Sequence, residues 1–170
     1  MNKELVLIAH NIRSTHNVGS IFRTCDGFGI KKVFLTGYTP YPKSKNDNRL
    51  PHLAEKINGQ IHKTALGAEQ SVDWENSDDV FELIQKLRDL DYKILALEQD
   101  PNSTKVYNFK FDGKIALLIG EEVEGIDKNI LKLCDEIVEI PMKGQKESFN
   151  VSVAVGIALY QLRFSNLSDL

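Results

Sequence analysis

The polar residues with the clearest capacity for chemistry lie in the segment His10–Arg23, which directly follows the short apolar run Leu5–Ala9. The segment turns through Asn, Arg, Ser, Thr and His and then enters an apolar pattern with helical spacing, for which Asn17 is the expected N-cap. Arg13 and Arg23 beside a helix N-terminus would form a site for a phosphate or another anion. A solvated helix face with a well-capped start explains the same residues, so this segment alone does not distinguish an anion site from an ordinary helix surface.

A second polar segment, Gly120–Gly125, follows the apolar run Ile115–Ile119 and reads Gly-Glu-Glu-Val-Glu-Gly. Its two glycines permit tight turns and close approach of the backbone. Three carboxylates within a few residues repel one another, so at least one is expected to have a partner, and Glu122 is the candidate for an inward role. The segment is not the dinucleotide-binding fingerprint, because the middle glycine is missing. An acidic loop that caps the following helix is the alternative.

A third segment, Ile140–Leu159, begins where a strand is expected to end at Pro141 and continues through a glycine-containing loop. A helix is expected to start near Ser148 or Asn150. Its small residues, which would let another backbone come close, are Ser152, Ala154, Gly156 and Ala158. A glycine in mid-helix costs about 1 kcal/mol relative to alanine. We therefore expect a packing reason for it, either a second helix of the same chain or the seam of a dimer.

Five short, branched apolar runs indicate the elements that position these segments. They are typical of strands buried on both faces of a parallel sheet, and they are Leu5–Ala9, Lys32–Thr36, Lys93–Leu97, Ile115–Ile119 and Ile137–Ile140. Helical patterns alternate with them over Val18–Phe28, Val80–Leu90, about Asp127–Leu133 and about Asn150–Leu162, with Gly29 closing the first. The alternation predicts an α/β fold. We expect a single domain, residues 1–170, with a mainly parallel sheet between helices in three layers.

The ends of the strands indicate where a ligand binds. In an open parallel sheet, ligands bind beyond the carboxyl ends of the strands, and the runs that end at Ala9, Ile119 and Ile140 are followed by the three polar segments. The stretch Gly37–Asn48 is the one loop-like insertion. The last residues, Ser165–Leu170, are polar and are expected to fray.

Composition excludes several classes of protein. The formal net charge of the 170 residues is −3 and the pI is about 5.8, so any basic contacts to nucleic acid must be local or pooled across an oligomer. Cys25 and Cys134 lack metal-like spacing and are expected to be free thiols in a reducing compartment. No apolar run approaches the ~18 residues of a membrane span, and no secretory signal is evident. We expect a cytosolic protein that binds no membrane and no metal.

Together the three segments resemble, in order, spacing and residue identity, the three motifs of the SpoU family of RNA ribose methyltransferases within the SPOUT superfamily. The first motif corresponds to Asn17, Arg23 and Gly29, and the second to Gly120, Glu122 and Gly125. The third corresponds to Ile140, Pro141, Met142, Ser148, Phe149 and Asn150. The resemblance covers Leu5–Gln161, which is nearly the whole chain.

This resemblance implies a C-terminal deep trefoil knot, S-adenosylmethionine as the methyl donor, and a homodimer in which Arg23 of one subunit faces the cofactor of the other. The residues implied to hold the cofactor are Leu118, Ile119, Gly120, Ile140, Pro141, Met142, Ser148, Phe149 and Val151. Two positions depart from the family pattern: Phe149 stands where Leu is usual, and Glu121 where a small residue is usual. The added charge of Glu121 beside the cofactor is expected to bear on affinity.

The resemblance also implies the catalytic residues, which are Asn17, Arg23, Glu122, Ser148 and Asn150. In this hypothesis Arg23 holds the target ribose and its phosphate, and Ser148 and Asn150 position the hydroxyl. Asn17 and Glu122 orient Arg23 and the loop of the second motif. Arg23 is a poor proton acceptor, because a guanidinium pKa lies above 12 and lowering it by about five units requires roughly 7 kcal/mol. A phosphate oxygen or water is the more economical acceptor.

The implied substrate is RNA. Candidate phosphate contacts are Arg13, Lys43, Lys45, Arg49, Lys56, Lys143 and Lys146, and each also fits an ordinary surface charge. By family analogy the short chain favours tRNA, with rRNA as the alternative. A non-catalytic RNA-binding protein and a small-molecule oxidoreductase are the competing functions. The intact motif residues argue against the first, and the missing glycine fingerprint argues against the second.

Overall fold

Seven parallel strands form the centre of the structure, a computed structural model that describes residues 3–164. Their order in the sheet is β3-β2-β1-β6-β4-β7-β5, and every pairing between neighbours is parallel. The strands are β1 (Glu4–His10), β2 (Lys32–Thr36), β3 (Trp74–Ser77), β4 (Lys93–Leu97), β5 (Thr104–Lys105), β6 (Lys114–Ile119) and β7 (Glu136–Glu139). The five predicted strands are confirmed as β1, β2, β4, β6 and β7, and they form the middle of the sheet.

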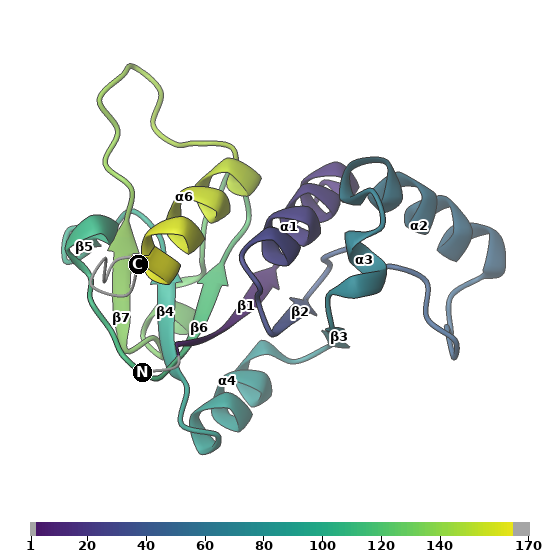
Figure 1. Cartoon of the computed structure of the whole chain (residues 1–170), viewed down its shortest axis with the longest axis horizontal. Helices are drawn as coiled ribbons and strands as arrows, with labels where there is room; N and C mark the ends of the chain where they lie inside the picture. Colours follow the sequence, from purple (N-terminus) through teal and green to yellow (C-terminus); the bar gives the residue numbers. More distant parts are fainter. Residues whose placement is uncertain (1–2, 165–170) are drawn as a thin grey trace.

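Helices cover both faces of this sheet (Figure 1). They are α1 (Thr15–Gly27), α2 (Pro51–Ala65), α3 (Ala68–Ser71), α4 (Val80–Asp89), the 3₁₀ turn η1 (Val106–Asn108), α5 (Lys128–Leu131) and α6 (Val151–Phe164). The predicted three-layer α/β architecture is therefore confirmed. The trefoil knot implied by the family resemblance stays a prediction.

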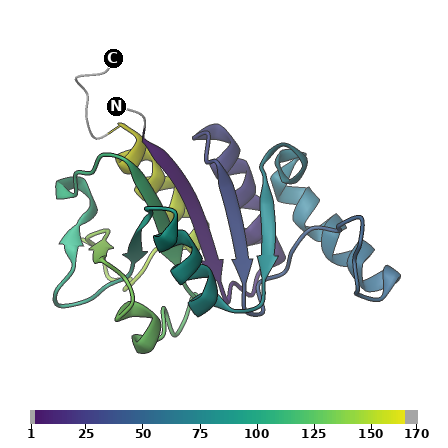
Figure 2. The same cartoon turned by 90° about the horizontal axis from the view of Figure 1, so that it is seen from below.

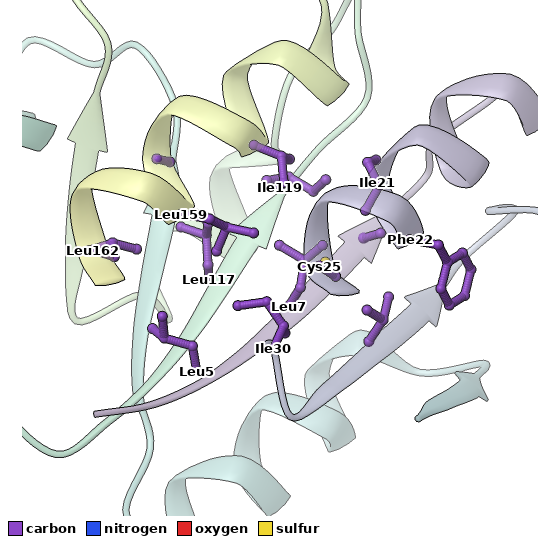
Figure 3. Packing of buried hydrophobic residues seen from close by; sticks show 14 of the residues in the cluster. Leu5, Leu7, Ile21, Phe22, Cys25, Ile30, Leu117, Ile119, Leu159 and Leu162 are labelled. Atoms are coloured by element: carbon purple, nitrogen blue, oxygen red, sulfur yellow. The ribbon is translucent and has the colours of Figure 1, made fainter. Parts of the chain in front are cut away.

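Two hydrophobic clusters bind these layers to the sheet, and alternate residues of β1 supply both. Leu5, Leu7 and Ala9 pack with α1, α2 and α6, whereas Val6 and Ile8 pack with α4 and α5. Figure 3 shows the first cluster, where Phe22 and Cys25 of α1 and Leu159 of α6 meet the sheet. Burial on both faces explains why these strands are continuous apolar runs in the sequence.

The two strands that the sequence did not predict are the edge strands β3 and β5. The β3 strand reads Trp-Glu-Asn-Ser and each of its residues is only half-buried, and β5 has two residues. An edge strand needs no second apolar face, so neither carries the apolar run on which the prediction depended. Helices α2 and α3 were also not predicted, because they contribute few buried residues to the core.

The expected N-cap of α1 was wrong. Ser14 caps the helix, and its hydroxyl accepts a hydrogen bond from the backbone N–H of Asn17 at 3.2 Å. This leaves the Asn17 side chain free for another role, described below. At the other end Gly29 has a φ of +60°, as the prediction of a glycine-closed helix requires.

Two further expectations differ from the structure. The helix expected near Asp127–Leu133 is reduced to α5, with Asp127 as its N-cap, because Lys132 and Leu133 lie in a turn at its end. Among residues 3–164 no backbone outside α6 lies within 4 Å of a Cβ built at Gly156, which would meet only Thr24 Cγ2, at 3.8 Å. The within-chain reason expected for this glycine is therefore absent from the described residues. The predicted fraying of 165–170 lies outside them.

Helices α1 and α2 cross at very short distance, and Gly19 makes this possible. A Cβ at Gly19 would lie 2.2 Å from the carbonyl oxygen of Ile61 and 2.2 Å from Thr64 Oγ1. The Thr64 hydroxyl donates a hydrogen bond to the carbonyl of His16 at 2.8 Å, which ties α2 to the first turn of α1.

We expect Gly19→Ala to destabilise the fold by about 1–3 kcal/mol, because the added methyl forces the two helix backbones apart. Urea unfolding followed by circular dichroism measures this. Gly27→Ala is the matched control in the same helix, because a Cβ there meets nothing within 4 Å, and helix propensity should make it neutral or stabilising by up to about 1 kcal/mol. Equal stability of the two variants would contradict the close crossing.

Candidate functional site

The carboxyl ends of four neighbouring strands, β1, β6, β4 and β7, meet at one edge of the sheet. The segments that follow them are 11–13, 120–125, 98–99 and 140–150. Parallel pairing makes this unavoidable, because every strand delivers its next loop to the same edge. The edge therefore unites all three polar segments that the sequence singled out.

A chain of side-chain hydrogen bonds joins the three motif segments. Asn17 Nδ2 donates to Glu122 Oε1 at 3.0 Å, and Asn150 Nδ2 donates to Asn17 Oδ1 at 3.2 Å. Asn150 Oδ1 in turn accepts from the backbone N–H of Ser152 at 3.0 Å, and so holds the first turn of α6. Glu122 thus faces inward, but its partner is Asn17 and not Arg23.

The loop of the second motif owes its shape to its two glycines and to Glu98. A Cβ at Gly120 would lie 2.8 Å from the carbonyl oxygen of Gly125, and Gly125 has a φ of +72°. Glu98 Oε2 accepts a hydrogen bond from the backbone N–H of Ile126 at 2.9 Å. A Cβ at Gly125 would lie 2.3 Å from the same oxygen, so any other residue there would break this contact.

Glu121, the residue that departs from the family pattern, is buried and has a structural task. Its Oε2 accepts hydrogen bonds from the backbone N–H groups of Val123 and Glu124, at 3.1 and 2.5 Å. These bonds, with Glu124 first, hold the pKa of the Glu121 carboxyl below its ordinary value. Arg13 Nε lies 2.9 Å from the other oxygen, Oε1, as an ion pair without the alignment of a hydrogen bond. The extra charge is therefore compensated locally.

Arg13 is held at the surface beside this loop. Its side chain is 66% exposed, and a hydrogen bond to Tyr38, followed by the charge of Glu121, raises the pKa of its guanidinium. Tyr38 is itself half-exposed, and its backbone N–H donates to Asn11 Oδ1 at 3.2 Å. Arg13 is thus an oriented cation with its outer face open to solvent.

A cavity of about 270 Å³ lies between the ends of β4, β6 and β7 and the start of α6. Six of the nine residues predicted to hold the cofactor line it, namely Ile119, Gly120, Ile140, Ser148, Phe149 and Val151. Leu118 does not, because its side chain faces the opposite layer, with α4 and α5. Pro141 and Met142 also lie outside the lining.

Carboxylates surround the apolar surface of this cavity. The glutamates among its lining residues are Glu98, Glu121, Glu122, Glu124, Glu139 and Glu147. Arg13 and Lys105 neutralise Glu121 and Glu139. The lining therefore suits a ligand that combines an aromatic or apolar body with positive charge.

Sequence reasoning missed Glu98 and Gln99, which follow β4. Glu98 holds the second motif loop as described, and Gln99 Nε2 donates to the backbone carbonyl of Glu147 in the third motif loop. Both residues line the cavity. The signal was available, because they directly follow the predicted strand Lys93–Leu97, to which the same carboxyl-end rule applies.

The structure does not bring Arg23 into this cluster. Its side chain is exposed on α1, on the same side as His16, and within residues 3–164 it has no hydrogen bond or ion pair. Ser148 is also exposed, at the cavity rim. Of the proposed catalytic set, the chain itself thus assembles Asn17, Glu122 and Asn150.

The candidate phosphate contacts differ in whether their side chains already have a partner within the protein. Arg49 is engaged inside the loop, where it binds Asp47 at 2.5 Å, donates to the carbonyls of Tyr41 and Pro42, and stacks on Tyr41 at 3.7 Å. Lys43 pairs with Glu55 at the surface. The side chain of Lys45 is exposed.

The described part of the chain holds neither a metal-binding cluster nor a membrane-spanning helix. No group of three or more His, Cys, Asp or Glu side chains there is arranged to hold a metal ion. None of the helices in residues 3–164 has both the length and the apolar character needed to cross a membrane. Cys25 and Cys134 are free thiols, as predicted.

Comparison with known proteins decides the family. The model of the SpoU rRNA methylase family matches residues 4–160. The chain belongs to this family. It is 29% identical over 161 residues to the 23S rRNA (guanosine-2'-O-)-methyltransferase RlmB of Escherichia coli K12. This match covers 95% of the chain but only 60% of RlmB. It is also 29% identical to the tRNA (guanosine(18)-2'-O)-methyltransferase of Aquifex aeolicus, over 94% of the chain and 68% of that enzyme.

Solved structures of this SpoU protein's relatives show the same fold. The TrmH/SpoU tRNA modifying enzyme of A. aeolicus aligns with a TM-score of 0.80 at 24% identity, over 99% of the chain and 78% of that structure. The SpoU methyltransferase AviRb of Streptomyces viridochromogenes in complex with AdoMet aligns with a TM-score of 0.78 at 22% identity, over 97% of the chain and 58% of that structure.

The depressed pKa of Glu121 predicts a pH effect. Because the folded-state pKa lies below the ordinary value of 4.5, the charged carboxylate stabilises the fold above that value, and this stabilisation is lost as the pH falls through the folded-state pKa. We expect Glu121→Gln to be less stable than wild type near pH 7 and to approach it near pH 3. Urea unfolding at several pH values measures the difference, and a constant difference would contradict the role of the charge.

Proposed function

We propose that this SpoU protein transfers a methyl group from S-adenosylmethionine to a ribose 2'-hydroxyl of RNA in the cytosol. The observation that carries the proposal is the hydrogen-bonded chain Glu122–Asn17–Asn150. It joins the three family motifs at the wall of a cavity that the second and third motifs line. The intact motif residues argue against a protein that only binds RNA.

The relatives support the type of reaction and leave the RNA open. RlmB is named for 2'-O-methylation of guanosine in 23S rRNA and the Aquifex enzyme for guanosine 18 of tRNA. We propose tRNA as the first substrate class to test, because the Aquifex tRNA enzyme is matched over a larger share of its length than RlmB. rRNA is the alternative.

The cavity supports S-adenosylmethionine as the donor. Ile140 and Phe149 offer apolar surface for an adenosine, and the Phe at 149 replaces the usual Leu without loss of apolar character. Glu98, Glu122 and Glu147 have no cationic side chain paired with them in residues 3–164. They offset the charges of a sulfonium and an ammonium group. When bound, S-adenosylmethionine supplies an electrophilic methyl group.

Residues of the chain then position the methyl donor and the acceptor. Asn17 fixes the second and third motif loops relative to each other, and this sets the distance between donor and acceptor. Ser148, at the cavity rim, orients the acceptor hydroxyl in this proposal. Arg13, already oriented by Glu121, offers its exposed face to a phosphate. A phosphate oxygen or water takes the hydroxyl proton, since a guanidinium keeps its own proton in proteins.

Arg23 completes this site from a second copy of the chain. Helix α6 exposes an apolar stripe on one face, whose residues are Val153, Ile157, Tyr160 and Phe164. Tyr160 is 59% exposed and packs with Phe28 of α1 and Phe164. We infer that this stripe and the exposed face of α1 that holds Arg23 form the seam of a homodimer, which also gives Gly156 its use.

We expect labelled methyl groups from S-adenosylmethionine to enter a 2'-O-methylnucleoside of total tRNA taken from a strain that lacks the protein. Total rRNA is assayed separately, and digestion to nucleosides identifies the product. Asn17→Ala should reduce the rate at least tenfold, because both hydrogen bonds of the cluster are lost. Gly27→Ala in the same helix should retain the wild-type rate. Bound S-adenosylmethionine with no label in either RNA would contradict the proposed function.

We expect Arg23→Ala and Arg23→Lys to lose most methyl transfer while S-adenosylmethionine affinity, measured by calorimetry, changes by less than about twofold. Arg23 does not line the cavity of its own chain, and lysine lacks the planar fork that binds a phosphate through two bonds. Near-normal turnover of Arg23→Lys would exclude a role for the fork.

We expect sedimentation to show a dimer that Tyr160→Lys converts to a monomer, because the substitution buries an unpaired charge in the seam. Phe81→Lys is the control, since Phe81 is an exposed aromatic residue of α4, on the other face of the sheet. A wild-type monomer, or a Tyr160→Lys dimer, would contradict the proposed seam.

A further inference from the structure

One segment of this acidic protein is basic. Residues 43–63, named here the basic arm, carry five basic side chains against the two acidic side chains Asp47 and Glu55. The basic ones are Lys43, Lys45, Arg49, Lys56 and Lys63. The arm therefore has a formal charge of +3, while the whole chain has −3. The remaining 149 residues carry −6, so the arm stands out against the rest of the surface.

The basic arm projects from the body of the molecule. It consists of the end of the loop after β2 and helix α2, which extends beyond the β3 edge of the sheet in both views (Figures 1 and 2). Only Ala54, Ile61 and Ala65 of α2 are buried. At 1.5 Å per residue, the 15 residues of α2 span about 22 Å. A partner can thus reach most of its length.

The exposed face of α2 is organised. His52, Lys56, Gly59 and Lys63 are spaced four, three and four residues apart, which places them on one face. All four are exposed, and this face lies opposite the buried Ala54, Ile61 and Ala65. Lys56 and Lys63 have no hydrogen bond or ion pair within residues 3–164, and a Cβ at Gly59 would meet nothing within 4 Å. The stripe therefore carries two lysines without an ion pair among residues 3–164, on either side of a glycine that leaves the helix backbone uncovered.

The arm is rigidly connected to the candidate active site. Arg49 ties its loop through Asp47 and two carbonyls. The Thr64 hydroxyl, next to Lys63, donates to the carbonyl of His16 in α1. In α1, Asn17 directly follows His16, and Arg23 lies about two helical turns after His16. A ligand held on the stripe is thereby positioned relative to the first motif.

We propose that the basic arm is an RNA-docking surface, on which the His52–Lys56–Lys63 stripe of α2 contacts the sugar-phosphate backbone of the substrate outside the methylated nucleotide. This inference rests on the proposed function, because RNA is the polyanion which that function requires. The acidic cavity repels phosphates, so the backbone flanking the target needs positive charge elsewhere. Phosphate contacts of this kind orient the RNA without reading its sequence.

The test compares Lys56→Ala/Lys63→Ala with wild type in binding to fluorescein-labelled total tRNA over a series of salt concentrations. Loss of two phosphate contacts should weaken binding about tenfold or more near 0.1 M salt. It should also reduce the slope of log K against log salt by about 1.5. Alanine favours the helix, so folding is preserved. The matched control is Lys93→Ala/Lys110→Ala, which removes two exposed lysines outside the arm.

S-Adenosylmethionine affinity and methyl transfer are measured on the same proteins. Three results together support the basic arm. The arm variant binds RNA more weakly than wild type, the control variant keeps the wild-type salt slope, and both variants keep the wild-type affinity for S-adenosylmethionine. Arm variants that bind and methylate tRNA like wild type overturn the arm and leave the proposed function standing. A wild-type chain that binds phosphatidylglycerol vesicles but neither tRNA nor rRNA overturns both proposals and points to a membrane surface.

Discussion

The side chain of Asn17 is the interaction on which the site depends. Its amide donates to Glu122 and accepts from Asn150, so one residue on α1 fixes loops that follow β6 and β7. Only a carboxamide offers a donor and an acceptor in this geometry, because an aspartate cannot donate and an aliphatic residue can do neither. The rest of the structure brings these three residues within reach. Parallel strands deliver the loops to one edge, Ser14 caps α1 in place of Asn17, and Glu98 and Gln99 hold the backs of the loops.

Charge is divided between two parts of the molecule. The cavity is lined by glutamates, which suit a cationic donor, while the basic arm carries a net positive charge and Arg13 is exposed beside the cavity. In the proposed reaction the donor is a cation and the acceptor a polyanion, and a single neutral surface would serve neither ligand well. Glu121 shows how the division is kept at the border. Its buried carboxylate organises the second motif loop and at the same time holds Arg13 at the surface, so the pair adds little net charge to the cavity.

The two long helices beside α1 have different relations to it. Helix α2 approaches so closely at Gly19 that no side chain fits between the backbones. Helix α6 packs through its buried face and leaves Val153, Ile157, Tyr160 and Phe164 exposed. An exposed apolar stripe of this kind is typical of an interaction surface. Arg23 is exposed on α1 and has no hydrogen bond or ion pair among residues 3–164, and in the proposed dimer a second subunit would cover both.

The sequence by itself determined the five central strands, α1, α4 and α6, and the three motif segments, because burial on both faces and helical spacing leave strong apolar patterns. It also named Glu122 as the candidate for an inward role, since at least one of three neighbouring carboxylates is expected to have a partner. Only the tertiary structure decided which partner. The bond from Asn17 to Glu122, the pairing of Glu121 with Arg13 and the tethers from Glu98 and Gln99 join residues far apart in the chain, and no local spacing encodes such contacts. Edge strands β3 and β5 and helix α2 were likewise decided by packing. Much of each element is exposed, so its sequence shows no strong apolar pattern.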